Sequence, residues 1–128
     1  MKILTAQEIL YLHHRIVEET GGSHGVRDLG LLEAALQRPF AGFGDYELFT
    51  TILEKVSAFL DALIRNHPFV DANKRTGLSA AVLMLELNGY SFASTQQEFE
   101  DFAVRVATEH LEIEEISNWL EAPASPKQ

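Results

Sequence analysis

The clearest hydrophobic pattern of the chain lies in its middle, over residues 49–66. Apolar side chains recur there at the three- and four-residue intervals that place them on one face of an α-helix: Ile52, Leu53, Val56, Phe59, Leu60, Leu63 and Ile64. Pro68 disfavours helical geometry at the residue before it. We therefore predict an amphipathic helix over residues 49–66 that ends at His67 and packs against other helices.

A second helix is predicted over residues 74–88, with Asn73 as its N-cap and Gly89 as its C-terminal glycine. Beyond Arg75 its only charged residue is Glu86, and small or apolar side chains occupy its whole circumference. A helix that is apolar all round is normally buried. We expect this segment to be the central helix of the fold.

Capping-box sequences mark two more helix starts, because a Thr and a Glu three residues later satisfy free backbone N–H groups. One begins at Thr5 and opens a helix that runs to about Thr20, where two glycines follow; the other begins at Thr95. Helices are also predicted over residues 29–37, capped by Asp28, and over the final apolar repeat, which is formed by Ile113, Ile116, Trp119 and Leu120.

Strands contribute little to the expected fold. Residues 90–93 favour a short extended piece, but strands and helices do not alternate and no repeat of fixed period occurs. The predicted class is all-α, with one domain over residues 1–121. The tail, residues 122–128, has two prolines and no apolar anchor, so we expect it to be loose.

An irregular segment of unusual composition precedes the amphipathic helix. Residues 40–46 combine two glycines with the aromatic side chains of Phe40, Phe43 and Tyr46. The segment is too short for a helix and too apolar for an ordinary solvated loop. It is either a flap beside a functional site or a loop that packs its aromatic rings on the core.

Composition and charge exclude several classes of protein. The chain has 128 residues, of which 46% are hydrophobic and 23% charged, and it contains no cysteine, so thiolate catalysis and disulfides are excluded. Neither a secretory signal nor an apolar run of about 20 residues is evident, which favours a cytoplasmic protein without a membrane span. A net charge of −9 argues against direct DNA binding. The acidic stretch over residues 98–121 is either a solvated face or a surface for a basic partner.

Chemistry-bearing residues concentrate on the turn between the two strongest helices: His67, Asp71, Asn73, Lys74 and Arg75. A helix N-terminus attracts anions, and the adjacent Lys and Arg add charges suited to phosphate oxygens. A carboxylate beside phosphates commonly binds Mg²⁺. A neutral histidine can accept a proton from a hydroxyl near neutral pH.

Each of these residues also has an ordinary structural interpretation. A histidine after a helix is usually structural, Asn73 caps helices in many proteins, and Arg75 can pair with Asp71 across the turn. Their density on one turn favours a functional site. His13 and His14 are different, because adjacent helical residues point apart, and we expect a structural or solvent role for both.

The segment His-Pro-Phe-Val-Asp-Ala-Asn-Lys-Arg-Thr-Gly, residues 67–77, resembles the signature of the Fic superfamily, in particular its Doc (death-on-curing) toxin branch. The likeness extends to residues 25–35, 38–40 and 88–90, and covers residues 3–110. It implies a helical bundle around a buried central helix, with a short flap before the motif. Residues 40–46 fall where that flap is expected, with Phe40, Phe43 and Tyr46 aligning the target peptide.

Three positions depart from the commoner Fic pattern, whose members usually transfer AMP from ATP to a protein hydroxyl. Ala72 and Lys74 replace two glycines, and Leu78 stands where a final arginine would be. Doc-type chains with this pattern are kinases. The resemblance therefore implies that the γ-phosphate of ATP is transferred to a threonine or serine of a translation protein, with elongation factor Tu as the first candidate, so that translation and growth are inhibited.

The resemblance also implies individual roles and partners. His67 would be the base, Asp71 the Mg²⁺ ligand, and the phosphates of ATP would be held by Asn73, Lys74, Arg75 and Thr76, with Arg75 also counted as catalytic. A Phd-like antitoxin would bind a groove on the chain, and the absence of an autoinhibitory motif suits control by such a partner. Two alternatives stay open: AMP or another nucleotidyl transfer to a different protein, and a non-catalytic module that only binds an antitoxin or host protein.

Overall fold

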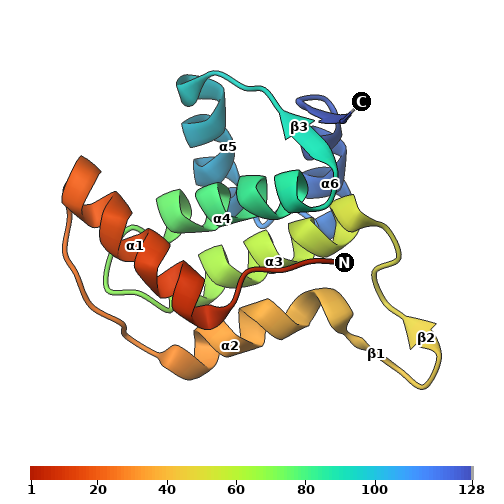
Figure 1. Ribbon diagram of the computed structural model, residues 1–128, viewed down its shortest axis with the longest axis horizontal. Helices are drawn as coiled ribbons and strands as arrows, with labels where there is room; N and C mark the ends of the chain where they lie inside the picture. Colours follow the sequence, from red (N-terminus) through yellow and green to blue (C-terminus); the bar gives the residue numbers. More distant parts are fainter. Residues whose placement is uncertain (128) are drawn as a thin grey trace.

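The computed structural model describes residues 1–127 and is mainly helical (Figure 1). These residues form six α-helices: α1 (Ala6–Thr20), α2 (Leu29–Gln37), α3 (Ile52–Asn66), α4 (Asn73–Leu87), α5 (Gln96–Glu109) and α6 (Ile113–Glu121). A 3-10 turn, η1 (Arg38–Phe40), follows α2. The short strands form two antiparallel pairs, β1 (Gly42–Phe43) with β2 (Tyr46–Glu47), and β3 (Tyr90–Phe92) with β4 (Ala124–Pro126). The predicted all-α class is confirmed.

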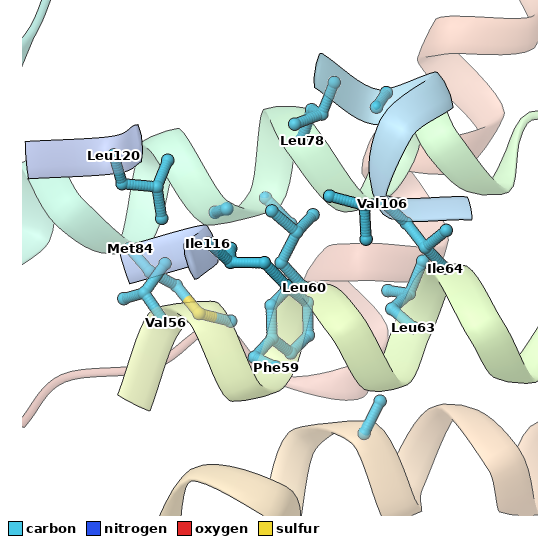
Figure 2. Close-up of a cluster of buried hydrophobic side chains, with 14 of the residues drawn as sticks. Val56, Phe59, Leu60, Leu63, Ile64, Leu78, Met84, Val106, Ile116 and Leu120 are labelled. Carbon is cyan, nitrogen blue, oxygen red and sulfur yellow. The ribbon is translucent and has the colours of Figure 1, made fainter. Parts of the chain in front are cut away.

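Helices α3 and α4 pack side by side in the middle of the bundle (Figure 1). Helix α3 contacts α2, α4, α5 and α6, whereas α4 contacts α1, α3 and α5. Figure 2 shows side chains from four of these helices meeting in one core, and each is at most 2% exposed: Val56, Phe59, Leu60, Leu63, Ile64, Leu78, Met84, Val106, Ile116 and Leu120. The core therefore joins the two helices that flank the motif.

Helix α4 is central, as predicted, but it shares that place with α3. Its Leu83 and Leu87 residues remain 39% and 45% exposed, because within residues 1–127 no helix covers the α4 face between α1 and β3. At Gly77, a Cβ atom would lie 3.2 Å from Leu63 and 3.3 Å from Leu60, so a glycine lets α4 approach α3 closely. This close approach brings the start of α4 against the end of α3.

Two helix starts differ from the predictions. Helix α3 begins at Ile52 rather than residue 49, because the Thr51 side chain accepts a hydrogen bond from the Glu54 N–H at 3.1 Å. Asn73 is not the N-cap of α4 but its first helical residue; the cap position is Ala72, in the left-handed conformation. The Asn73 side chain turns back toward the preceding loop instead. The capping box of Thr5 and Glu8 is confirmed.

The C-terminal segment also differs from its prediction as a loose tail. Residues 124–126 pair with β3 as β4, and the Lys127 N–H donates to the Gly89 carbonyl at 2.7 Å. Ala124 is 9% exposed and joins the core, so the segment has the apolar anchor that its composition concealed. Residue 128, the last of the predicted tail, lies outside the described residues. Within residues 1–127, each helix is too short or too polar to cross a lipid bilayer.

Candidate active site

The motif loop, residues 67–72, turns the chain sharply from α3 into α4. It does so through left-handed backbone conformations at His67 (φ 48°) and Ala72 (φ 63°). Residues other than glycine rarely adopt this backbone conformation, so each of the two costs about 1 kcal/mol or more in strain. Such strain persists only where surrounding contacts hold the backbone in place.

Asn73 supplies one set of these contacts. Its carboxamide accepts a hydrogen bond from the Phe69 N–H and donates another to the Phe69 carbonyl, both at 2.9 Å. The side chain is only 8% exposed. Both polar ends of the carboxamide are thus used inside the protein, and Asn73 shapes the loop rather than offering its side chain to a phosphate.

His13 supports the loop from α1. Its ring stacks on Phe69, with ring centres 3.9 Å apart and planes 6° apart, and its Nε2 lies 2.9 Å from the Asp71 carbonyl. A carbonyl oxygen can only accept, so Nε2 carries the proton and donates. Burial lowers the pKa of His13, which favours the neutral ring. The expected structural role of His13 is confirmed.

Asp71 projects from the loop with its carboxylate fixed by two backbone N–H groups. Oδ2 accepts from Ser23 at 3.0 Å and Oδ1 from Ala72 at 2.7 Å. These bonds, that of Ser23 first, lower the pKa of Asp71, and the charge of Arg75 adds to the effect. The carboxylate is therefore ionised at neutral pH. It is partly exposed and each oxygen keeps a further lone pair, so it fits a Mg²⁺ ion.

Residues 22–28, which connect α1 to α2, form the second wall of the site. The Arg27 and Asp28 N–H groups donate to the Pro68 carbonyl at 2.8 and 3.0 Å, and the Val70 N–H donates to Gly25 at 3.1 Å. Val26 and Phe69 form an isolated antiparallel bridge. The two segments therefore lie side by side like short strands, although about forty residues separate them in sequence.

The roles of Arg27 and Gly22 in this wall had no direct signal in the sequence. The Arg27 Nε donates to the His67 carbonyl at 2.7 Å, and its Nη2 donates to Asn66, so a positive charge lies at the C-terminus of α3. A Cβ atom on Gly22 would lie 2.6 Å from Asp71 Oδ2 and 3.0 Å from an Arg75 nitrogen. The one sequence indication concerned Arg27, because residues 25–35 shared the resemblance of the motif.

Arg75 and Lys74 occupy the first turn of α4. The Arg75 Nη1 donates to the Gly21 carbonyl at 2.9 Å and to the Thr20 hydroxyl, which ties α4 to the end of α1. Both cationic residues line a hollow of about 430 Å³ between α1, α4 and α5, with Leu78, Phe99 and Glu100 also on its wall. Its volume is in the range of small-molecule sites. The first helical bond of α4 joins the Thr76 N–H to Ala72, so three earlier N–H groups lack a partner within the helix.

His67 is exposed, and its imidazole forms no hydrogen bond within residues 1–127. Thr76 is the opposite case. It is fully buried, and its hydroxyl has no hydrogen-bond partner within those residues. The Thr76 hydroxyl is therefore not accessible to a phosphate in this conformation, and the predicted phosphate-binding role of Thr76 stays a prediction. Its position on the helix turns it toward the core.

The aromatic hairpin formed by β1 and β2 lies at the opposite end of α3 from the motif, and its predicted role as a target-docking flap stays a prediction. Phe40, Phe43 and Tyr46 are 52%, 78% and 56% exposed, and the last two stack on each other with ring centres 5.2 Å apart. The hairpin precedes α3, whereas the motif follows it, so the length of α3 separates them, about 22 Å for its 15 residues (Figure 1). The segment beside the motif is residues 22–28.

Comparison with known proteins assigns the family. The model of the Fic/DOC family matches residues 3–85, which include α1 to α3, the whole motif and most of α4. The chain is 37% identical over 110 residues to Toxin Doc of Mycolicibacterium smegmatis, covering 84% of this chain and 85% of that protein. It is 33% identical over 120 residues to Protein kinase doc of Escherichia phage P1, covering 94% of each chain. The chain belongs to the Fic/DOC family.

Proposed function

We propose that the chain is a Doc-type toxin, a protein kinase that transfers the γ-phosphate of ATP to a threonine or serine hydroxyl of a translation protein. The observation that carries the proposal is the start of α4, where Ala72 holds the left-handed turn and Lys74 stands exposed beside Arg75 at the hollow. The names of the two relatives, a toxin and a protein kinase, support it.

Most residues of the site bind the phosphates or Mg²⁺, or hold the loop in shape, and one residue transfers the proton. Lys74, Arg75 and the free N–H groups at the start of α4 hold the phosphate oxygens, since cations and a helix N-terminus both favour anions. Asp71 holds Mg²⁺, which when bound neutralises negative charge on the phosphates. Asn73 and His13 keep the loop in shape.

His67 acts as the base on the acceptor hydroxyl. Its exposed imidazole stands at the mouth of the loop, and Arg27 fixes its backbone through the carbonyl oxygen. His67 accepts the hydroxyl proton as the acceptor oxygen bonds to the γ-phosphorus. The bond between that phosphorus and its bridging oxygen breaks, and ADP leaves. Most of the catalysis is positioning and charge neutralisation.

The experiment that tests the proposal follows each phosphate separately. Purified chain and elongation factor Tu are incubated with Mg²⁺ and with ATP labelled at either the α or the γ position. Label on the target from γ-labelled ATP alone is expected. Label from α-labelled ATP would replace the kinase with an AMP transferase, the second activity the motif allows.

The His67→Ala variant is the control for catalysis. It is expected to fold normally and to lose both transfer and growth inhibition. If it still inhibits growth as the unchanged chain does, the chain acts as a non-catalytic binding module. Other translation proteins are tested in the same assay if elongation factor Tu stays unlabelled.

The partner of the toxin is expected to be a Phd-like antitoxin, and the uncovered face of α4 is a candidate groove for it. Leu12 and Leu83 line two adjoining hollows, one of about 630 Å³ along α1 and one of about 430 Å³ that reaches Phe92 and Phe99. An amphipathic helix can place its apolar face in such a groove. Calorimetry should show weaker antitoxin binding for Leu83→Glu and unchanged binding for Leu48→Glu, an exposed leucine that lines neither hollow.

A further inference from the structure

Three exposed side chains converge at the C-terminal end of α1 and in the loop that follows it. His14 and Glu18 are neighbours one helical turn apart, and His24 comes from residues 22–28. Glu18 Oε1 lies 2.9 Å from His24 Nε2 and 4.0 Å from His14 Nε2, and the two imidazole centres are 4.9 Å apart. One ligand atom from each residue lies within 4.8 Å of the other two.

We propose that His14, Glu18 and His24 bind a transition-metal dication, Zn²⁺ by preference, and that the metal fixes the loop beside the active site to α1. Two imidazole nitrogens and one carboxylate oxygen are a zinc donor set, with water as the fourth ligand. Zinc bonds of about 2.0–2.1 Å in a tetrahedron place the ligand atoms about 3.4 Å apart. Exposed side chains reach this geometry from the observed distances by movements of about 1 Å.

A simple ion pair between Glu18 and His24 explains less of the arrangement. It does not need His14, and two protonated imidazoles side by side would repel each other. Arg15, the nearest strong cation in sequence, pairs with Glu19 and Tyr11 and so does not neutralise Glu18. A metal ion uses all three groups and needs both imidazoles neutral.

The location of His24 connects this metal to the active site. The next residue toward α1, Ser23, donates its N–H to Asp71, and the next residue onward, Gly25, accepts from the Val70 N–H. A metal on His24 therefore restrains two of the contacts that hold the motif loop from outside. The Mg²⁺ ligand Asp71 is a separate group with oxygen donors only, and the metal site does not depend on which phosphate the enzyme transfers.

Metal titration tests the binding site. The full chain, stripped with a chelator and kept in excess Mg²⁺ to occupy Asp71, is titrated with Zn²⁺ by calorimetry and with Co²⁺ by its visible absorption. One Zn²⁺ per chain is expected. The variants His14→Gln, Glu18→Gln and His24→Gln should each weaken binding by more than the ~10-fold that loss of a supporting residue costs.

The matched control is His110→Asn, which removes an exposed imidazole at the end of α5, outside the cluster, and keeps a residue tolerated at φ 50°. It should bind Zn²⁺ as the unchanged chain does. The proposal is overturned if no saturable binding occurs, or if His14→Gln and His24→Gln bind as tightly as the unchanged chain.

Hydrogen exchange tests the proposed restraint on the loop. Zn²⁺ should slow exchange of the Ser23 and Val70 amides in the unchanged chain and leave it unaltered in His14→Gln. Exchange at these two amides that does not respond to bound Zn²⁺ in the unchanged chain would overturn the restraint. Circular dichroism of each variant establishes that the helices are retained.

Discussion

The two ends of α3 carry loops that contain similar residues but are held in different ways. At the C-terminal end, the motif loop is fixed by the Asn73 side chain, by His13 on α1 and by residues 22–28. At the N-terminal end, the β1–β2 hairpin exposes its aromatic rings, and Phe43 is 78% exposed. Each loop has aromatic and acidic residues, but the polar groups of the candidate active site gather at the first loop.

This difference shows that contacts from distant segments can hold the backbone of a loop in the conformation that a site requires. Left-handed residues such as His67 and Ala72 are stable only because hydrogen bonds from distant segments define the backbone around them. Groups held this way need little reordering when a substrate binds. The hairpin has few such contacts, so its composition alone does not establish the predicted role in docking a target.

The largest expected effect is on catalysis at the motif loop, which follows the C-terminal end of α3. His67→Gln removes the proposed base from an exposed position and should lower phosphate transfer by ~100-fold or more. The free energy of unfolding should change by less than about 0.5 kcal/mol, because the side chain has no partner within residues 1–127. Transfer assays and urea denaturation measure the two effects. A large loss of stability would show that His67 also supports the fold.

The next effect is on the stability of the motif loop itself. Asn73→Ala leaves the buried N–H and carbonyl of Phe69 without their partner, which should cost about 3 kcal/mol. Urea denaturation measures this loss. The control Asn118→Ala, on the exposed surface of α6, should be nearly neutral. Equal losses in both variants would contradict the role of Asn73.

A pair of glycine substitutions compares the two ends directly. Gly22→Ala places a Cβ against the Asp71 carboxylate at φ 112° and should cost about 2 kcal/mol as well as activity. Gly44→Ala in the hairpin has φ 57° with no atom within 4 Å of the new Cβ, so it should cost about 1 kcal/mol and leave transfer unchanged. Thermal unfolding and transfer assays check both. Loss of phosphate transfer in Gly44→Ala would show that the hairpin contributes to the active site.

A smaller effect is expected from pH. The Ser23 and Ala72 N–H groups lower the pKa of Asp71 in the folded chain, so the ionised carboxylate favours folding. Its contribution is complete above the ordinary aspartate pKa of about 3.9 and is lost as pH falls through the lower folded pKa. The stability difference between the unchanged chain and Asp71→Asn should therefore shrink below about pH 4. A difference that is constant from pH 3 to 7 would contradict this assignment.

The smallest effect is expected at the exposed end of α3. Replacing Phe43 and Tyr46 together by alanine removes two exposed rings and should change the free energy of unfolding by about 0.5 kcal/mol or less. Phosphate transfer to the protein target should be unchanged. If transfer to protein falls while ATP binding stays normal, the hairpin docks the target after all, as the sequence suggested.

The sequence by itself determined the helices and the position of the candidate site. Hydrophobic periodicity and caps such as Thr5, Asp28 and Thr95 depend on residues within one or two turns, so they can be read without a structure. The density of polar groups from His67 to Arg75 located the motif for the same reason. The catalytic roles of these residues remain predictions.

Only the tertiary structure decided which groups surround the motif. Ser23 meets Asp71 across 48 positions, and Arg27 meets His67 across 40. The turn of Asn73 toward Phe69, the burial of Thr76, the pairing of residues 124–126 with β3 and the meeting of His24 with Glu18 depend likewise on how the helices pack. Local patterns hold no information on such distant pairs, because the packed core, rather than the neighbouring sequence, brings these segments together.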